Sequence, residues 1–265
     1  MKQKPVLCGL AALLCLLLLL SGCAGLKRLL KDDAGENLNL PRNDTDMAAF
    51  SKLEDGTVTY PGARQGIDIS GYQQYIDWSR VRAAGIDFAI LQIGFRGYGA
   101  DGTLNSDVRF AEYYSGAEAV GIDVGVYFYS QATSVEEARE EARYVLELLE
   151  DKALQLPVFY DWEEVQKGRT KGLANSRVGD YAKAFCEEIT AGGYSAGVYF
   201  NQKYGYSIMG LEQLRDYAFW LAEYNPYQSF SYAVQIWQYT GQGAVDGVDL
   251  PVDRDLMYLE EEETE

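Results

Sequence analysis

Short apolar runs alternate with amphipathic stretches from Gly66 onward, and this alternation limits the fold more than any other feature of the chain. Strand-like runs separated by helical patterns are typical of repeated βα units and a parallel sheet. Seven runs have strand composition: Ile67–Ile69, Phe88–Ile93, Val124–Tyr129, Val158–Tyr160, Ala196–Phe200, Phe219–Ala222 and Val234–Trp237. The sequence therefore predicts an α/β fold.

Helical patterns lie between several of these runs. One begins at Ser134, where Glu137 completes a Ser-x-x-Glu capping box, and its apolar residues keep the helical period as far as Leu149. A second pattern starts near Val178 and stops at the glycine pair 192–193. The turn sequence Gly-Ile-Asp occurs at residues 85 and 121, a separation that is the size of one βα unit.

The absence of a phosphate-binding loop separates two ways of arranging these units. Roughly 200 residues of βα units without a G-x-G-x-x-G motif favour a closed barrel over a nucleotide-binding open sheet. We therefore expect an irregular, TIM-barrel-like (β/α) barrel that forms a single catalytic domain, with functional residues at the C-terminal ends of its strands. The alternative is a Rossmann-like or periplasmic binding fold.

The stretch Pro157-Val-Phe-Tyr-Asp-Trp-Glu-Glu164 places acids at the end of a buried strand. Side chains alternate along a strand, so Asp161 and Glu163 point to one face and Trp162 to the other, with the two acids roughly 6–7 Å apart at the backbone. Two carboxyls in one site shift each other's pKa, so that one donates a proton while the other stays charged. Glycosidases use such a pair of carboxyl groups for catalysis. The alternative is a pair of solvated acids with no catalytic role.

The chain contains no histidine. Catalysis by Ser-His-Asp or Cys-His groups, histidine general bases and most zinc sites are thereby excluded. Carboxylates must carry any acid-base chemistry, with tyrosine as the only other proton donor. We expect neither a metal nor an organic cofactor.

The charge of the chain limits its partners. It has 23 basic against 40 acidic residues and a formal net charge of −17. Such a chain repels phosphate backbones, so we expect no nucleic-acid partner. A neutral or mixed-charge polysaccharide such as peptidoglycan suits it better.

The N-terminus has the pattern of an export signal. A basic start, an apolar run from Leu10 to Leu20 and the ending Leu20-Ser-Gly-Cys23 resemble the signal peptide and lipobox of bacterial lipoproteins, with residues 1–22 as the signal. The run is too short to span a bilayer, which needs about 20 residues. The resemblance implies that Cys23 carries the lipid that holds the protein to the membrane. The alternative is an ordinary cleaved signal with an incidental cysteine.

Three further segments follow the signal. Residues 23–60 are polar with short apolar islands, so we expect the lipidated cysteine and a flexible tether at the cell envelope. We expect residues 61–259 to form the catalytic domain and residues 260–265 to form an acidic tail. Cys186 has no second cysteine with which to form a disulfide, so we expect it to be a small buried apolar residue. We also expect the protein to be a monomer.

Eight segments together have the order of a known enzyme family: Gly66–Ser70, Ile76–Trp78, Phe88–Ile90, Gly125–Ser130, Tyr160–Glu163, Trp220–Tyr224, Trp237–Tyr239 and Val252–Asp253. They resemble glycoside hydrolase family 25, the lysozyme-like N-acetylmuramidases, over Gly66 to Tyr258. The resemblance implies an irregular β/α barrel. It also implies cleavage of the β-1,4 bond that follows N-acetylmuramic acid in peptidoglycan.

The resemblance assigns roles to four acids by position. Glu163 matches the catalytic acid and Asp161 its partner carboxylate. Asp68 and Asp253 match two further acids that line the family's groove, with Asp249 as the alternative to Asp253. Glu163 would protonate the glycosidic oxygen, while Asp161 stabilises the oxocarbenium-like centre or orients the substrate's acetamido group. Direct inverting attack by water stays open.

One residue departs from the family pattern. Trp162 stands between the paired acids, where the family often has a small aliphatic residue. Because it faces away from the acids, we expect it to pack outward against helices.

Aromatic residues near the predicted strand ends offer flat faces for sugar rings. The candidates for substrate contact are Tyr129, Tyr160, Tyr224, Trp237 and Tyr239. For each of them the alternative is a packed core aromatic. Arg96 is a candidate ligand for a lactyl or peptide carboxylate, and its alternative is a salt bridge at the rim.

Two other functions stay open. A family 18 type chitinase or endo-N-acetylglucosaminidase also has an Asp-Trp-Glu ending, but the D-G-x-D run of that family is absent before Asp161. The other possibility is a non-catalytic lipoprotein that binds wall glycan.

Overall fold

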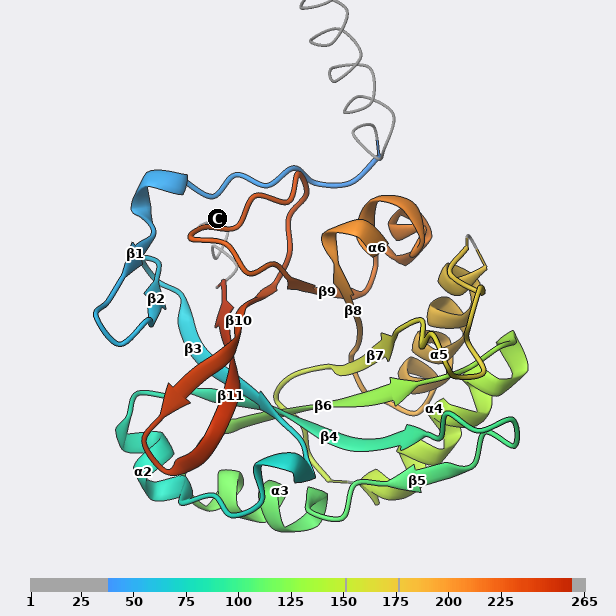
Figure 1. The fold of residues 1–265 in the computed structure, drawn as a ribbon, viewed down its shortest axis with the longest axis horizontal. Helices are drawn as coiled ribbons and strands as arrows, with labels where there is room; N and C mark the ends of the chain where they lie inside the picture. Colours follow the sequence, from blue (N-terminus) through green and yellow to red (C-terminus); the bar gives the residue numbers. More distant parts are fainter. Residues whose placement is uncertain (1–37, 151, 176, 259–265) are drawn as a thin grey trace, which may run out of the picture. The chain divides into compact units, whose positions relative to one another are not determined.

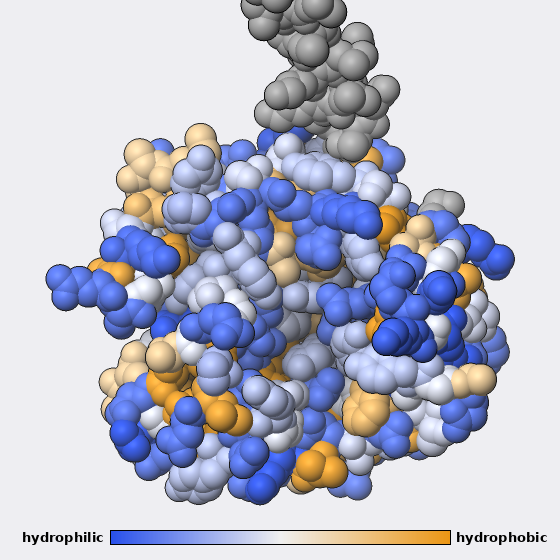
Figure 2. Space-filling model, in the orientation of Figure 1, coloured by the Kyte–Doolittle hydropathy of each residue, from blue (hydrophilic) through white to orange (hydrophobic). Residues whose placement is uncertain are grey.

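The computed structural model describes residues 38–150, 152–175 and 177–258 (Figure 1). The compact unit that contains the fold begins at Asn39. Cys23, the signal and the acidic tail lie outside the described residues, so the predictions for them stay predictions. The face drawn in Figure 2 is mostly hydrophilic, and its apolar residues form small separate patches.

Eight strands close into a barrel in the order β3, β11, β10, β9, β8, β7, β6, β4 and back to β3. Their bounds are β3 (Arg64–Ile69), β4 (Phe88–Arg96), β6 (Asp123–Ser130), β7 (Val158–Trp162), β8 (Ala196–Asn201), β9 (Ala218–Ala222), β10 (Ile236–Val245) and β11 (Val248–Met257). The first seven in chain order run parallel, and β11 is antiparallel to both of its neighbours. The predicted irregular β/α barrel is confirmed.

Strand β11 is the barrel strand that the sequence did not predict. It contains Pro251 and four charged residues, so it lacks the continuous apolar run of the other strands. In the structure, β11 pairs with both β10 and β3 and so closes the barrel. Asp253 and Asp255 face the barrel interior, and Arg254 between them faces outward.

The helices lie outside the barrel: α2 (Trp78–Ala83), α3 (Phe110–Ala119), α4 (Val135–Leu149), α5 (Val178–Ala191) and α6 (Gln202–Ser207). The Ser134 hydroxyl caps α4 by accepting from the backbone N–H of Glu137. The Glu137 carboxylate turns instead to the N–H and hydroxyl of Thr133, so only half of the predicted capping box forms. Helix α5 ends at Ala191 with Gly192 as its C-cap, so it stops at the predicted glycine pair, and Gly193 has a φ of +90°.

Alternation along β7 separates its side chains into two environments. Phe159 faces the barrel interior and packs in one cluster with Phe88, Ile90, Leu156, Trp220 and Ile236. Tyr160 and Trp162 face outward, against Phe185 of α5 and Tyr204 of α6. The expectation that Trp162 packs outward is therefore confirmed.

The segment from Asn39 to Tyr60 packs on the barrel and is not a tether. Backbone hydrogen bonds join Asn43 to Ser231 and Ala233 to Pro41. The Phe50 ring lies 5.4 Å from the Trp237 ring, and the short strands β1 (Ser51–Lys52) and β2 (Val58–Thr59) pair with each other. The prediction of a flexible tether is wrong from residue 39 onward, because apolar residues of this segment such as Phe50 pack against the barrel.

Two smaller expectations concern membranes and cysteine. Cys186 is buried on α5 and free, as predicted. Among the described residues, no helix is long and apolar enough to cross a bilayer.

This N-terminal packing predicts a loss of stability on truncation. A chain that begins at residue 61 should unfold at a lower temperature than one that begins at residue 39, because Trp237 loses its cover. In the longer chain, Phe50→Ala should cost about 1–3 kcal/mol, less than the roughly 3–5 kcal/mol typical of a fully buried phenylalanine. Thermal and urea unfolding measure both effects. Leu53→Ala is the control, since Leu53 is 52% exposed; equal stability of the two chains would contradict the prediction.

Candidate active site

Acidic side chains from three parts of the chain meet inside one end of the barrel. Asp68 lies on β3 directly opposite Asp253 of β11, and the burial of Asp68 combines with repulsion from Asp253 and Asp255 to raise its pKa well above the usual range. Asp161 on β7 interacts with Glu163, which follows the same strand. Acidic groups from all three segments interact with the hydroxyl of Tyr224. The structure thus brings together the four acids that the sequence selected.

The choice between Asp249 and Asp253 is decided by position on β11. Asp249 is exposed near the start of the strand. Asp253 pairs in register with Asp68 and lines a hollow of about 250 Å³ together with Tyr72 and Tyr127. Asp253 therefore belongs to the acidic end of the barrel, and burial raises its pKa to about 6.

Asp161 and Glu163 occupy different environments. Asp161 is 7% exposed, and its Oδ1 has no hydrogen-bond partner among the described residues. Burial, followed by repulsion from Glu163, raises the pKa of Asp161 well above its usual range. Burial also raises the pKa of Glu163, while a hydrogen bond with the Tyr129 hydroxyl lowers it. The pair therefore holds a proton to a higher pH than a solvated carboxyl would, and it titrates as a unit.

Gln238 connects this site to its tyrosines, and sequence reasoning did not select it. Its Nε2 donates to Asp68 Oδ2 at 2.7 Å, and its Oε1 accepts from the hydroxyls of Tyr224 at 2.9 Å and Tyr199 at 3.0 Å. Gln238 lies between the two aromatic residues that were selected on β10. A strand with buried aromatics on one face places its intervening residue on the other face, and that alternation was the available signal.

Of the aromatic candidates, two lie at the acidic end of the barrel. Tyr129 is half-buried beside Asp161 and Glu163. Tyr224 is 61% exposed and its hydroxyl is held by Gln238. Both rings therefore lie beside the acids, and their contact with substrate stays a prediction.

Tyr160, Trp237 and Tyr239 were predicted to bind substrate, and for these three the prediction is wrong. Each is buried on the outer face of the barrel wall. The Tyr160 hydroxyl lies 2.9 Å from Ser130 Oγ, and the Trp237 indole N–H donates to the Glu223 carbonyl at 2.7 Å. Each of the three neighbours an inward-facing residue in sequence, so strand alternation turns it away from the site.

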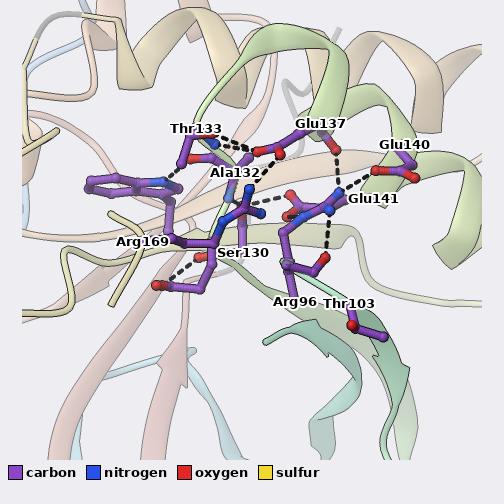
Figure 3. Close-up of polar contacts among 12 residues, drawn as sticks. Arg96, Thr103, Ser130, Ala132, Thr133, Glu137, Glu140, Glu141 and Arg169 are labelled. Carbon is purple, nitrogen blue, oxygen red and sulfur yellow. Dashed lines mark hydrogen bonds and ion pairs between the residues drawn. The ribbon is translucent and has the colours of Figure 1, made fainter. Parts of the chain in front are cut away.

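Arg96 was also predicted to bind a substrate carboxylate, but its guanidinium is already hydrogen-bonded to other residues of the protein (Figure 3). Its Nε donates to Glu141 at 2.7 Å and its Nη2 to Glu140 at 2.8 Å. Carbonyl oxygens of Gly102 and Glu137 accept further bonds. Arg96 is only 3% exposed, so the alternative of a salt bridge is what the structure contains.

Asp255 is a further acid that sequence reasoning did not select. It is fully buried, and its Oδ1 accepts from the Trp220 indole N–H at 2.8 Å. Burial raises its pKa to about 8, although the bond from Trp220 acts in the opposite direction. The signal in the sequence was its spacing of two residues from Asp253, which puts both side chains on one face of a strand.

The described residues contain no group of three or more His, Cys, Asp or Glu side chains placed to hold a metal ion. The expectation of a cofactor-free site stays a prediction. What the arrangement offers directly is a proton donor and a carboxylate side by side, surrounded by tyrosines at the mouth of a barrel. A closed β/α barrel with such a pair has the design of a glycoside hydrolase.

The sequence profile of glycosyl hydrolases family 25 matches residues 67–248. The match covers most of the barrel and includes Asp68, Asp161 and Glu163. The chain therefore belongs to glycosyl hydrolase family 25.

Relatives agree with this assignment. The uncharacterized protein YegX of Escherichia coli K12 is 30% identical over 196 residues, which cover 71% of this chain and 67% of YegX. The autolytic lysozyme of Clostridium acetobutylicum is 23% identical over 194 residues, which cover 72% of this chain and 55% of that enzyme. The chain thus spans little more than half the length of that lysozyme.

Solved structures show the same fold. The modular autolysin LytC of Streptococcus pneumoniae, in complex with a synthetic peptidoglycan ligand, aligns with a TM-score of 0.67 and 21% identity over 84% of this chain and 53% of its own. The bacterial lysozyme of Streptomyces coelicolor aligns with a TM-score of 0.60 and 25% identity over 73% of this chain and 91% of its own.

The raised pKa of Asp255 predicts how stability depends on pH. A carboxyl with a pKa near 3.9 when unfolded and near 8 when folded binds its proton more tightly in the folded state. The free energy of unfolding should therefore fall as the pH rises from about 4 to 8. Asp255→Asn keeps an acceptor for Trp220 and removes the ionisation, so it should raise the unfolding temperature at pH 8 and flatten the profile.

Asp249→Asn is the matched control, because it removes an exposed acid from the same strand. It should leave the shape of the stability profile unchanged. If Asp255→Asn lowers the unfolding temperature by the same amount at pH 5 and pH 8, then ionisation of Asp255 does not lower the free energy of unfolding.

Proposed function

We propose that this protein is a lysozyme, an N-acetylmuramidase that hydrolyses the β-1,4 bond between N-acetylmuramic acid and N-acetylglucosamine in peptidoglycan. The observation that carries the proposal is the Asp161–Glu163 pair at the mouth of a family 25 barrel. The autolytic lysozyme among the relatives and the autolysin with a peptidoglycan ligand among the similar folds support the choice of substrate.

In this proposal Glu163 protonates the oxygen of the leaving sugar. It lies beyond the end of β7 and is less buried than Asp161, so it reaches farther toward a bound glycan. A glycan that covers Glu163 removes water from its carboxyl and raises its pKa further, which favours the protonated form that donation requires.

Asp161 acts on the other side of the reaction. When the proton of the pair is on Glu163, the Asp161 carboxylate is charged and stabilises the oxocarbenium-like centre, directly or by orienting the acetamido group of the substrate. Asp68 and Asp253 line the groove, where Gln238 fixes the orientation of Asp68 through its 2.7 Å hydrogen bond.

Replacement of the acid tests this assignment. Glu163→Gln should lower hydrolysis of purified cell wall by about 10²–10⁴-fold, because an amide cannot supply the proton. Glycan binding and thermal unfolding should be close to wild type. Glu164→Gln is the control, since the neighbouring carboxylate accepts a hydrogen bond from Gly172 N–H and has no role in the reaction. A folded Glu163→Gln variant within a few-fold of wild-type activity would remove Glu163 from the role.

The new reducing end identifies the bond that is cut. After digestion and borohydride reduction, a muramidase converts muramic acid to muramitol and leaves glucosamine intact. Glucosaminitol as the main product, or faster cleavage of chitin oligomers than of wall, would instead indicate a glucosaminidase or chitinase. A wild-type protein that binds wall without cutting it would be a glycan-binding lipoprotein.

We also propose that the enzyme is an extracytoplasmic lipoprotein, anchored in the membrane at the cell envelope through Cys23. The support comes from the sequence Leu20-Ser-Gly-Cys23 and the apolar run before it. Because the folded unit begins at Asn39, residues 24–38 would connect it to the lipid, a reach of roughly 50 Å when fully extended.

Loss of the anchor should separate location from activity. Cys23→Ala should abolish incorporation of labelled fatty acid and retention in the membrane fraction, because no thiol remains to receive the lipid. The activity of the released domain should be unchanged. Cys15→Ala, another cysteine of the predicted signal, is the control and should keep the label. Unchanged membrane retention of Cys23→Ala would contradict the lipoprotein assignment.

A further inference from the structure

Asp161 and Glu163 differ in what holds their backbones. Asp161 lies within the ladder between β6 and β7, where it pairs with Tyr129. The last pair of that ladder joins Ser130 and Trp162, so Glu163 lies one residue beyond it. The sheet therefore fixes the position of Asp161 but not that of Glu163.

Two side chains hold the Glu163 backbone in place of hydrogen bonds from a neighbouring strand. Gln131 Nε2 donates to the carbonyl oxygen of Glu163 at 2.9 Å, and Thr170 Oγ1 lies 3.2 Å from the same oxygen. Gln131 and Thr170 are both fully buried. Buried polar groups of this kind are found where their hydrogen bonds are satisfied, and here their shared partner is the backbone of Glu163.

The two side chains also fix each other. Gln131 Nε2 makes a second bond to the Ser130 carbonyl at 2.9 Å, and Gln131 Oε1 lies 3.0 Å from Thr170 Oγ1. Thr170 Oγ1 in turn accepts from the backbone N–H of Val165 at 2.9 Å, and its single proton is shared between Gln131 Oε1 and the Glu163 carbonyl. With nitrogen facing two carbonyls and oxygen facing a hydroxyl, the amide has a single orientation that satisfies its partners. The Glu163 carbonyl thus enters a network with little freedom.

Both sides of this network are anchored to helix α4 (Figure 3). The Glu137 carboxylate accepts from Thr133 N–H at 2.7 Å, close to Gln131, and pairs with Arg169 at 2.6 Å, next to Thr170. The Arg169 side chain is only 11% exposed, so water screens this ion pair little. One carboxylate therefore ties together the two loops that carry Gln131 and Thr170.

We propose that Gln131 and Thr170 are positioning residues that clamp the backbone of Glu163 and thereby set where its carboxyl meets the substrate. This inference rests on the proposed role of Glu163 as the proton donor. The clamp also keeps the Glu163 carboxyl within hydrogen-bonding distance of the Tyr129 hydroxyl. Displacement of a catalytic group by about 1 Å can cost on the order of 10²-fold in rate.

The test removes one hydroxyl from the clamp. Thr170→Val keeps the shape of the side chain, and we expect it to lower kcat by about 10–100-fold on soluble peptidoglycan fragments. KM should stay within about three-fold, because the groove itself is unchanged. Thr170→Ser restores the hydroxyl and should recover kcat to within about three-fold of wild type. Gln131→Met, of similar volume, provides a second variant and should also lower kcat selectively.

Thr190→Val is the matched control. Its hydroxyl donates to the Cys186 carbonyl within α5, and the substitution removes the same atoms away from the acidic end of the barrel. Its kcat should equal that of wild type. Thermal unfolding of every variant shows whether lost activity reflects a smaller folded fraction.

Several outcomes would overturn the clamp. They are a Thr170→Val variant with wild-type kcat, a Thr170→Ser variant no better than valine, and losses of activity that only follow the folded fraction. If Thr170→Val does not fold, then unchanged kcat in Gln131→Met would also overturn it. A folded wild-type protein without muramidase activity would instead refute the proposed function, and this role with it.

Discussion

The two-residue period of the barrel strands is the constraint on which the rest of this structure depends. On β7 it sends Phe159 and Asp161 into the barrel, and Tyr160 and Trp162 toward the helices. The inward set is apolar at one end of the barrel and acidic at the other. The same strands therefore build a close-packed core and a reactive mouth, and the outward aromatics attach the helices that keep the barrel rigid.

This period also explains which parts could be predicted from the sequence. The parallel strands and the acid pair were predictable because apolar runs and the Asp-Trp-Glu spacing are local signals. Aromatic residues were selected by their nearness to strand ends, which does not reveal the face, so Trp237 was selected in place of Gln238. The carboxylate partners of Arg96 come from helix α4, and residues 39–60 pack against residues near the C-terminal end of the barrel sequence. Neither set of contacts is encoded locally.

Strand β11 shows the energetic side of the design. Its antiparallel course brings Asp253 and Asp255 next to Asp68, where burial raises the pKa of all three carboxyls. Such acids are stable in the folded protein mainly when protonated, so they oppose folding as the pH rises. The apolar layer of Phe159 and Trp220 below them supplies the offsetting hydrophobic burial. A chain selected for stability alone would have little reason to keep this cluster of acids.

The two groups of acids are supported in different ways, and this difference bears on how a barrel can evolve. Asp68, Asp161 and Asp253 are held by ladder pairs, so their positions follow from the closure of the barrel itself. Glu163 stands in the loop that follows β7, where Gln131 from the loop after β6 and Thr170 from its own loop hold its backbone. A residue held by side chains can be moved by single substitutions that leave the sheet intact. The position of Glu163 is therefore adjustable while the rest of the acidic site stays fixed by the fold.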